Sequence, residues 1–132
     1  MTELLTTVVS ERGFAQTLDA LVAGLERRHV EVFAQVDHAA NAQGAGLDLR
    51  PTTVVIFGAA KAGTPLMQAH QILGLDLPLR ALVYETAEGQ TCIAYREPAD
   101  ILARQGVSPD GFAAVAGMSD LLAAVAAEAA GG

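Results

Sequence analysis

Hydrophobic residues recur along the chain with two periods, one typical of helices and one typical of strands. Between residues 13 and 28 they fall at helical spacing, which predicts an amphipathic first helix with Phe14, Leu18, Leu21, Val22 and Leu25 on its apolar face. Residues 4–9 are rich in threonine and valine, which predicts a first strand. Residues 29–36 alternate between apolar and polar side chains, which predicts a half-buried second strand.

The stretch from Arg50 to Met67 organises the middle of the chain. Residues 54–57 are an unbroken apolar run, and because a strand with one wet face would alternate, this run predicts a strand covered on both faces. Gly58 ends the strand, and residues 58–64 form a loop. Thr64 and Pro65 then predict the start of a helix over residues 65–73, with threonine as its cap and proline as its first residue.

The remaining pattern predicts a hairpin and two helical pieces. The arms of the hairpin are residues 81–85 and 90–96. Pro98 begins a short helix that ends before Gly106. Ser108-Pro109 then predicts the start of another helix, and an alanine-rich helix covers residues 112–130. This order predicts a β-α-β-β-α-β-β core with helices on one face of a sheet, which is a two-layer α+β sandwich. A ferredoxin-like arrangement is the nearest generic alternative.

A single domain with two parts is expected. Residues 1–106 form the α+β core, and residues 107–132 form a C-terminal helical extension of the same domain. Because a sheet that is already covered has little need for a further apolar helix, we expect this extension to pack on the exposed flank of the domain or against a partner subunit.

Composition narrows the classes of partner. The 132 residues include 15 acidic and 8 basic side chains, so the formal net charge is −7. The sequence also contains no basic stripe. Both observations argue against a nucleic-acid-binding protein. Cys92 is the only cysteine, which excludes an internal disulfide and suits a reducing cytoplasm. The apolar C-terminal window contains Asp120 and Glu128, so no membrane span is expected, and no secretory signal is recognised.

The loop between Gly58 and Thr64 is the leading candidate site. A glycine-bounded loop that enters a helix presents free amides, here expected from Leu66 and Met67, and the helix dipole favours an anion there. Lys61 adds a full positive charge, and Gly63 gives the loop conformational freedom. The loop is not a P-loop, because Thr64 rather than lysine follows the second glycine.

Asp37 and His38 form a second candidate pair at the end of the predicted second strand. If that strand lies beside residues 54–57, both side chains approach the loop, where a histidine beside a carboxylate can act as a general base. The alternative is a local turn in which the two side chains bond to the backbone. In the hairpin, Tyr84 and Glu85 on one arm are expected to lie across from Tyr95 and Arg96 on the other, with cross-strand packing and a solvated ion pair. A ligand-facing role for Tyr95 or Arg96 is secondary.

A metal site is not expected. The three histidines, His29, His38 and His70, lack the spacing of metal ligands, and no cysteine pair exists. The sequence identifies no cofactor.

An ordered set of short motifs resembles the bacterial family known as domain of unknown function 302. The motifs lie between residues 6 and 107 and comprise Asp37-His38, Leu49-Arg50-Pro51-Thr52, Phe57-Gly58, Lys61 to Met67, Gly74 to Arg80, and Tyr95-Arg96 before Pro98. The resemblance implies a compact α+β fold, dimers among family members, no assigned activity, and a shared core that stops near Val107. The family usually has asparagine-proline after the phenylalanine-glycine pair, whereas this chain has Ala59-Ala60, which removes a polar side chain from the loop.

The leading interpretation is a domain that binds a small anionic or polar molecule at the strand-loop-helix site, within a homodimer. The expected ligand-binding residues are Asp37, His38, Gly58, Lys61, Gly63 and Thr64. One alternative is an enzyme that uses His38 as general base and Lys61 as electrostatic stabiliser. The other is a homodimeric interaction module without a small ligand.

Overall fold

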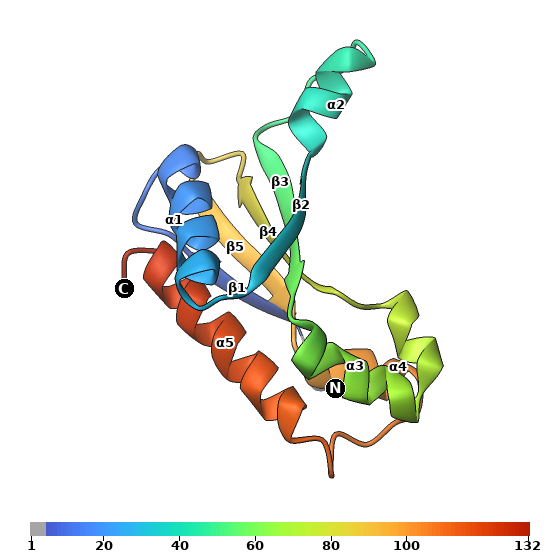
Figure 1. Ribbon diagram of the computed structural model, residues 1–132. Helices are drawn as coiled ribbons and strands as arrows, with labels where there is room; N and C mark the ends of the chain where they lie inside the picture. The colour runs from blue at the N-terminus through green and yellow to red at the C-terminus, as the bar shows by residue number, and fades with distance from the viewer. Residues whose placement is uncertain (1–4) are drawn as a thin grey trace.

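The computed structural model describes residues 5–132, so the predicted start of the first strand at Leu4 lies outside the described residues. Five strands and six helical segments follow one another along this part of the chain (Figure 1). They are β1 (Leu5–Val9), α1 (Phe14–Arg27), β2 (Glu31–Asp37), α2 (His38–Gly44), β3 (Thr52–Gly58), α3 (Ala60–Ala69), the 3-10 helix η1 (Gln71–Leu75), β4 (Leu79–Glu85), β5 (Thr91–Arg96), α4 (Pro98–Arg104) and α5 (Ala113–Ala129).

The five strands form one antiparallel sheet in the order β1-β5-β4-β3-β2. Strands β2 to β5 are therefore neighbours in chain order, and β1 closes the far edge against β5. Helix α1 connects the two edge strands by crossing one face of the sheet, which differs from the ferredoxin-like alternative. The predicted α+β sandwich is confirmed.

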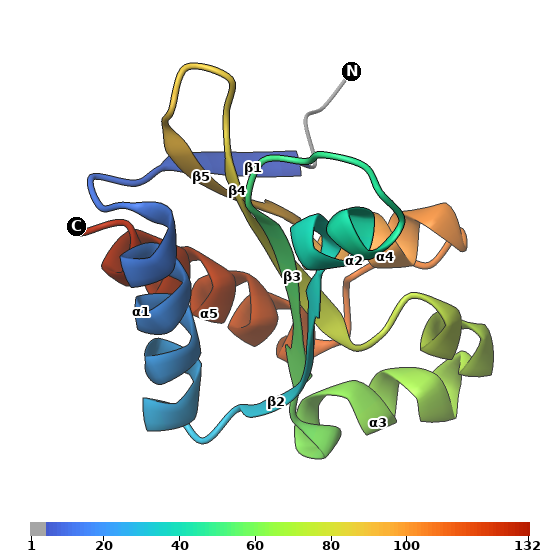
Figure 2. The same cartoon turned by 90° about the horizontal axis from the view of Figure 1, so that it is seen from above.

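Helices α1 and α5 lie side by side on one face of the sheet (Figures 1 and 2). The core between them and the sheet is fully apolar at its centre, where Leu21 and Leu25 of α1 meet Val55, Val83 and Ile93 of the sheet. Six residues of α5 are buried: Val115, Met118, Leu122, Val125, Ala126 and Ala129. The expectation that the C-terminal helix packs on an exposed flank is therefore wrong, because α5 is half of the layer that covers the sheet.

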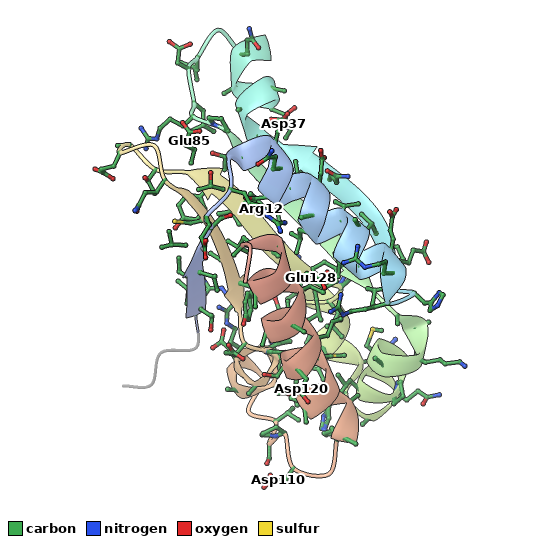
Figure 3. All side chains as sticks on the ribbon, turned by 90° about the vertical axis from the view of Figure 1, so that its left-hand side faces the viewer. Arg12, Asp37, Glu85, Asp110, Asp120 and Glu128 are labelled. Carbon is green, nitrogen blue, oxygen red and sulfur yellow. The ribbon has the colours of Figure 1, made fainter. Side chains whose placement is uncertain are left out.

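Two arginines at the end of α1 hold α5 in place. Glu128 on α5 contacts Arg27 and lies 3.3 Å from Arg28 Nη1, and Figure 3 shows Glu128 directed toward α1. Hydrogen bonding from Arg28 lowers the pKa of the Glu128 carboxyl below its ordinary value, and the charge of Arg27 acts in the same direction.

Strand β3, which lies between β4 and the edge strand β2, is not covered equally on its two faces. Thr53, Val55 and Phe57 are buried against the helices, whereas Val54 and Ile56 on the opposite face are only half-buried. The prediction of full cover on both faces is therefore wrong. We call the side that carries Val54 and Ile56 the open face of the sheet.

A β-bulge interrupts the alternation of β2. Val32 pairs with Phe57, and Ala34 pairs with Ile56, so Phe33 is an extra residue and half of its surface is exposed. Val32 and Ala34 therefore lie on different faces of the sheet, although the sequence alternation predicts one shared inner face.

Both predicted threonine-proline or serine-proline helix starts are wrong. Helix α3 begins at Ala60, so Thr64 and Pro65 lie inside it, and α5 begins at Ala113, five residues after Ser108. Pro65 is the sixth residue of α3, beyond its first turn, and it removes the intrahelical hydrogen bond to the Lys61 carbonyl. Among the helices of residues 5–132, none is long and apolar enough to cross a membrane.

Candidate functional site

A groove of about 520 Å³ lies on the open face of the sheet. Its floor is a row of small and medium apolar side chains from three neighbouring strands, because Val54 pairs with Leu82 and Leu82 pairs with Ala94. Its walls come from Leu5 of β1, Leu75 of η1 and Ile101 of α4. We call this site the open-face groove.

Three of the chain's seven arginines line the open-face groove: Arg80, Arg96 and Arg104. Side chains alternate along strands, so Arg80, two residues before Leu82, and Arg96, two residues after Ala94, point to the same face as that pair. Arg80 and Arg96 thus lie on the open face, each two residues beyond the last pair of the β4–β5 ladder, Leu82 and Ala94. Both residues are exposed, and neither side chain has an ion-pair or hydrogen-bond partner among residues 5–132.

The third arginine is already partnered. Arg104 Nη2 lies 2.9 Å from Asp100 Oδ2, one turn earlier on α4. At that distance the two groups form an ion pair. Their orientation does not meet the geometry of a hydrogen bond, and Asp100 Oδ2 accepts none. Within the described part of the chain, Asp76 contributes the one carboxylate that lines the groove, and His38 also lines it. The groove therefore carries a positive excess in a protein whose net charge is −7.

The two tyrosines of the hairpin remain protonated at neutral pH. Burial raises the pKa of the Tyr84 phenol, and neighbouring Cys92 adds to the effect. Burial also raises the pKa of Tyr95, and the nearby Glu97 carboxylate acts in the same direction. Tyr84 lies opposite Cys92 and Glu85 lies opposite Thr91, so the pairing of Tyr84 and Glu85 with Tyr95 and Arg96 expected from the sequence is wrong.

Asp37 and His38 lie far from the Gly58–Thr64 segment. Asp37 pairs with Thr53 and Glu31 pairs with Gly58, so Asp37 is at the opposite end of β3 from Gly58. Five residues separate Thr53 from Gly58, which corresponds to about 16 Å at roughly 3.3 Å per residue. The structure therefore does not bring the six predicted site residues into one place.

Asp37 has a local structural role. It is the N-cap of α2, and its Oδ1 accepts a hydrogen bond of 2.9 Å from the Ala40 amide (Figure 3). This confirms, for Asp37, the alternative of a local turn. His38, the next residue, lines the open-face groove.

The amides expected to bind an anion are inside a helix. Leu66 and Met67 follow the first residue of α3 by six and seven positions, so their amides belong to the helix's own hydrogen bonds. The amides of Ala62 and Gly63 near its start both donate to the Ala59 carbonyl, at 3.0 and 3.1 Å. The anion site predicted from these donors is therefore wrong.

A second cavity, of about 340 Å³, lies beside the start of α3. Gly58, Gly63 and Thr64 line it, so three of the predicted residues do share a site. Its other walls are mainly apolar and come from β2, α3, the segment before β4, and α5. We call this site the α3 cavity.

Lys61 lines neither cavity. His38 lines the groove, so the base and the stabilising cation of the enzyme hypothesis do not meet in either site. Within residues 5–132, no three histidine, cysteine, aspartate or glutamate side chains are close enough to hold a metal ion.

Sequence comparison identifies the family. The profile described as "Domain of unknown function DUF302" matches residues 6–128. The chain belongs to the DUF302 family. The match includes nearly all of α5, so the shared DUF302 core does not stop near Val107 as expected from the resemblance.

Related DUF302 sequences occur in longer proteins. Two relatives named "Fluoride-specific ion channel FluC 1", from Brucella suis biovar 1 and Brucella abortus biovar 1, are each 41% identical to the chain over 108 residues. The aligned region covers 80% of this chain but only 42% and 40% of the two relatives. The chain therefore spans about two fifths of the length of the curated relatives it matches.

A solved DUF302 structure has the same fold. The crystal structure of an uncharacterized conserved DUF302 protein from Bacillus stearothermophilus matches with a TM-score of 0.86, covering 97% of this chain and 99% of that chain. The two sequences are 21% identical, so this likeness establishes the shared architecture alone.

Sequence reasoning missed the arginines of the groove except Arg96. Arg80 and Arg96 are sixteen positions apart and come to line one groove only because the β4–β5 hairpin puts them on the same face of the sheet. A usable signal exists in the sequence, because Arg80-x-Leu82 and Ala94-x-Arg96 stand at equal distances from the hairpin turn.

Proposed function

We propose that this DUF302 domain binds a small anionic molecule in the open-face groove, with Arg80 and Arg96 as its principal contacts. One observation carries the proposal: two guanidinium groups that have no ion-pair or hydrogen-bond partner within residues 5–132 line the same groove over an apolar floor. Like charges on neighbouring strand positions repel each other, so an anion between them removes a cost that the free protein bears. Guanidinium groups also match the geometry of carboxylate and phosphate oxygens.

The surroundings of the two arginines support a molecule rather than a hydrated ion. The groove volume of about 520 Å³ is within the range of roughly 300–1,000 Å³ that small-molecule sites occupy. His38, which also lines the groove, adds a further hydrogen-bonding group.

A thermal-shift screen tests the proposal. We expect phosphate and organic carboxylates or phosphates to raise the melting temperature of the native protein, and we expect the same compounds to lose most of that effect in Arg96→Gln. Lys61→Gln removes the same charge outside the groove and serves as the matched control. Equal shifts in the native protein and Arg96→Gln would remove the groove from the proposal.

The names of the Brucella relatives supply one specific anion for this screen. Fluoride is small and strongly hydrated, and the groove is wide, so we expect fluoride to stabilise the domain no more than chloride at equal ionic strength. A fluoride-specific shift that disappears in Arg96→Gln would make fluoride itself the ligand of the groove.

We also propose that the domain forms a homodimer through the α2 arm, residues 38–50. The supporting observation is that α2 projects from the β2–β3 connection (Figure 1), buries none of its residues, and is followed by exposed Leu47 and Leu49. Apolar side chains on a projecting segment are typical of interfaces. Light scattering of the native chain should give twice the monomer mass. The double variant Leu47→Asp with Leu49→Asp should give the monomer mass. A monomeric native chain would refute this second proposal.

A further inference from the structure

The α3 cavity differs from the groove in position and chemistry. It lies where the start of α3, the bulge of β2 and the N-terminal half of α5 meet, and its volume is about 340 Å³. Its main apolar walls are Phe33, Met67, Leu77, Pro78, Met118 and Leu121. Phe33, the extra residue of the bulge, is half exposed beside it.

Small residues on α3 keep this cavity open. Ala59, Ala60, Ala62 and Gly63 line it from one side, so no long side chain reaches across toward α5. Part of the lining, including Phe33, Ala60 and Thr64, is exposed, so the cavity opens to solvent and its apolar walls face water. A guest molecule with an apolar body would remove that apolar surface from water.

The charged groups around the α3 cavity act in opposite directions on a charged guest molecule. Among the side chains of residues 5–132 that line it, Glu31 alone is charged, and its carboxylate disfavours an anionic guest. The N-terminus of α3, which begins at Ala60 and also lines the cavity, carries the positive end of the helix dipole and disfavours a cationic guest. Thr64 provides a hydroxyl group. An uncharged guest is therefore complementary to the whole lining.

We propose that the α3 cavity binds a small uncharged organic molecule with a compact alkyl or aryl body. The apolar body lies against Met67, Leu77 and Met118, and a single hydroxyl or similar polar group reaches Thr64. This site is separate from the open-face groove, and the proposal does not depend on the anion proposed for that groove.

Three probes with the same six-carbon chain test the charge argument: 1-hexanol, hexylamine and hexanoate. Met67 and Met118 both line the cavity, so their methyl signals in ¹H–¹³C NMR spectra report directly on binding. Met67→Leu and Met118→Leu assign the two signals. We expect hexanol to shift both signals at a concentration several-fold lower than either charged probe needs. Tighter binding of either charged probe, or no shift with hexanol, would overturn the proposal.

A variant whose side chain fills the α3 cavity provides the second test of the proposal. Ala62→Leu places a larger side chain in the space and is expected to abolish the hexanol shifts, whereas Ala116→Leu adds the same side chain at an exposed position of α5 and should not. Should Ala62→Leu fail to fold, Gly63→Ala replaces it. The added Cβ there lies 3.8 Å from Met67 and 3.9 Å from Leu77, which are ordinary contacts, so partial loss of binding is expected. Hexanol shifts that persist in the filled variant would refute the site.

Discussion

Replacing Arg80 by glutamine should change stability and binding in opposite directions. The substitution removes one of two like charges that the hairpin holds on the same face of neighbouring strands. Like charges at opposing strand positions destabilise by about 0.2–1 kcal/mol relative to neutral pairs. Arg80 has no ion-pair or hydrogen-bond partner within residues 5–132, so no compensating contact is lost. We therefore expect the unfolding free energy of the ligand-free protein to rise by about 0.5 kcal/mol.

The same substitution should weaken anion binding. A charge-assisted hydrogen bond contributes about 1.5–3 kcal/mol, and solvent in an exposed groove favours the lower end of that range. A loss of about 1.4 kcal/mol corresponds to a tenfold rise in Kd. Calorimetric titration with the best compound from the anion screen measures this change, and urea unfolding in chloride buffer measures the stability of the ligand-free protein.

Ionic strength provides an internal check. Repulsion between exposed charges is screened over about 10 Å at 0.1 M salt and over about 3 Å at 1 M, so the gain in stability should fall as salt is added. Lys61→Gln should leave Kd unchanged and alter stability by less than about 0.5 kcal/mol, as is usual for surface positions. A less stable Arg80→Gln protein with an unchanged Kd would refute the argument that the free groove bears uncompensated positive charge.

Three further predictions concern the helical layer. Leu122→Ala removes a side chain that is 1% exposed between α5 and the sheet and should cost about 2–5 kcal/mol in urea unfolding; a cost below 1 kcal/mol would contradict its central position. In Gly117→Ala, at an exposed site of α5, the added Cβ contacts nothing, so the unfolding free energy should rise by about 1 kcal/mol. In Gly24→Ala the added Cβ would lie 2.8 Å from Glu128 Oε1, so the rise in unfolding free energy should be smaller. The lowered pKa of Glu128 means that its contribution to stability is present above the ordinary glutamate pKa and is lost as pH falls through the lower value of the folded state. The melting temperature of Glu128→Gln should therefore fall less than that of the native protein between neutral and acidic pH, and parallel curves would contradict the role of the arginine contacts.

Much of the fold follows from local patterns. Helical spacing locates α1, threonine and valine content locates β1, and the glycine turn that ends at Gly89 locates the hairpin, where the positive φ of +85° suits glycine. The threonine-proline signal was misleading because it describes a preferred first turn without excluding an earlier start. At α3 the alanines before Thr64 form helix readily, so the helix begins five residues before Pro65. The serine-proline signal instead begins a turn, in which the Asp110 amide donates to Ser108 Oγ, and α5 begins only at Ala113.

The cover of each sheet face could not be predicted from local pattern alone. An apolar run such as residues 54–57 is equally compatible with a strand buried on both faces and with one whose second face carries a groove. The bulge at Phe33 has no signature in the alternation of β2, yet it moves Val32 and Ala34 to different faces and places an aromatic ring beside the α3 cavity. Both features depend on how neighbouring strands pair.

The separation of the predicted site into two places does follow from an elementary argument. Parallel neighbouring strands need a crossover of a dozen or more residues, usually a long helix, whereas antiparallel neighbours need only a short link. The segment between Asp37 and Thr52 contains one helix of seven residues, which spans about 10 Å, whereas the seven residues of β2 span about 23 Å. The helix is too short to return the chain along β2, so antiparallel pairing is favoured, and it puts Asp37 and His38 at the end of β3 that is remote from Gly58. Applied to the hairpin, counting outward from the turn through the Leu82–Ala94 pair puts Arg80 and Arg96 on the same face of the sheet.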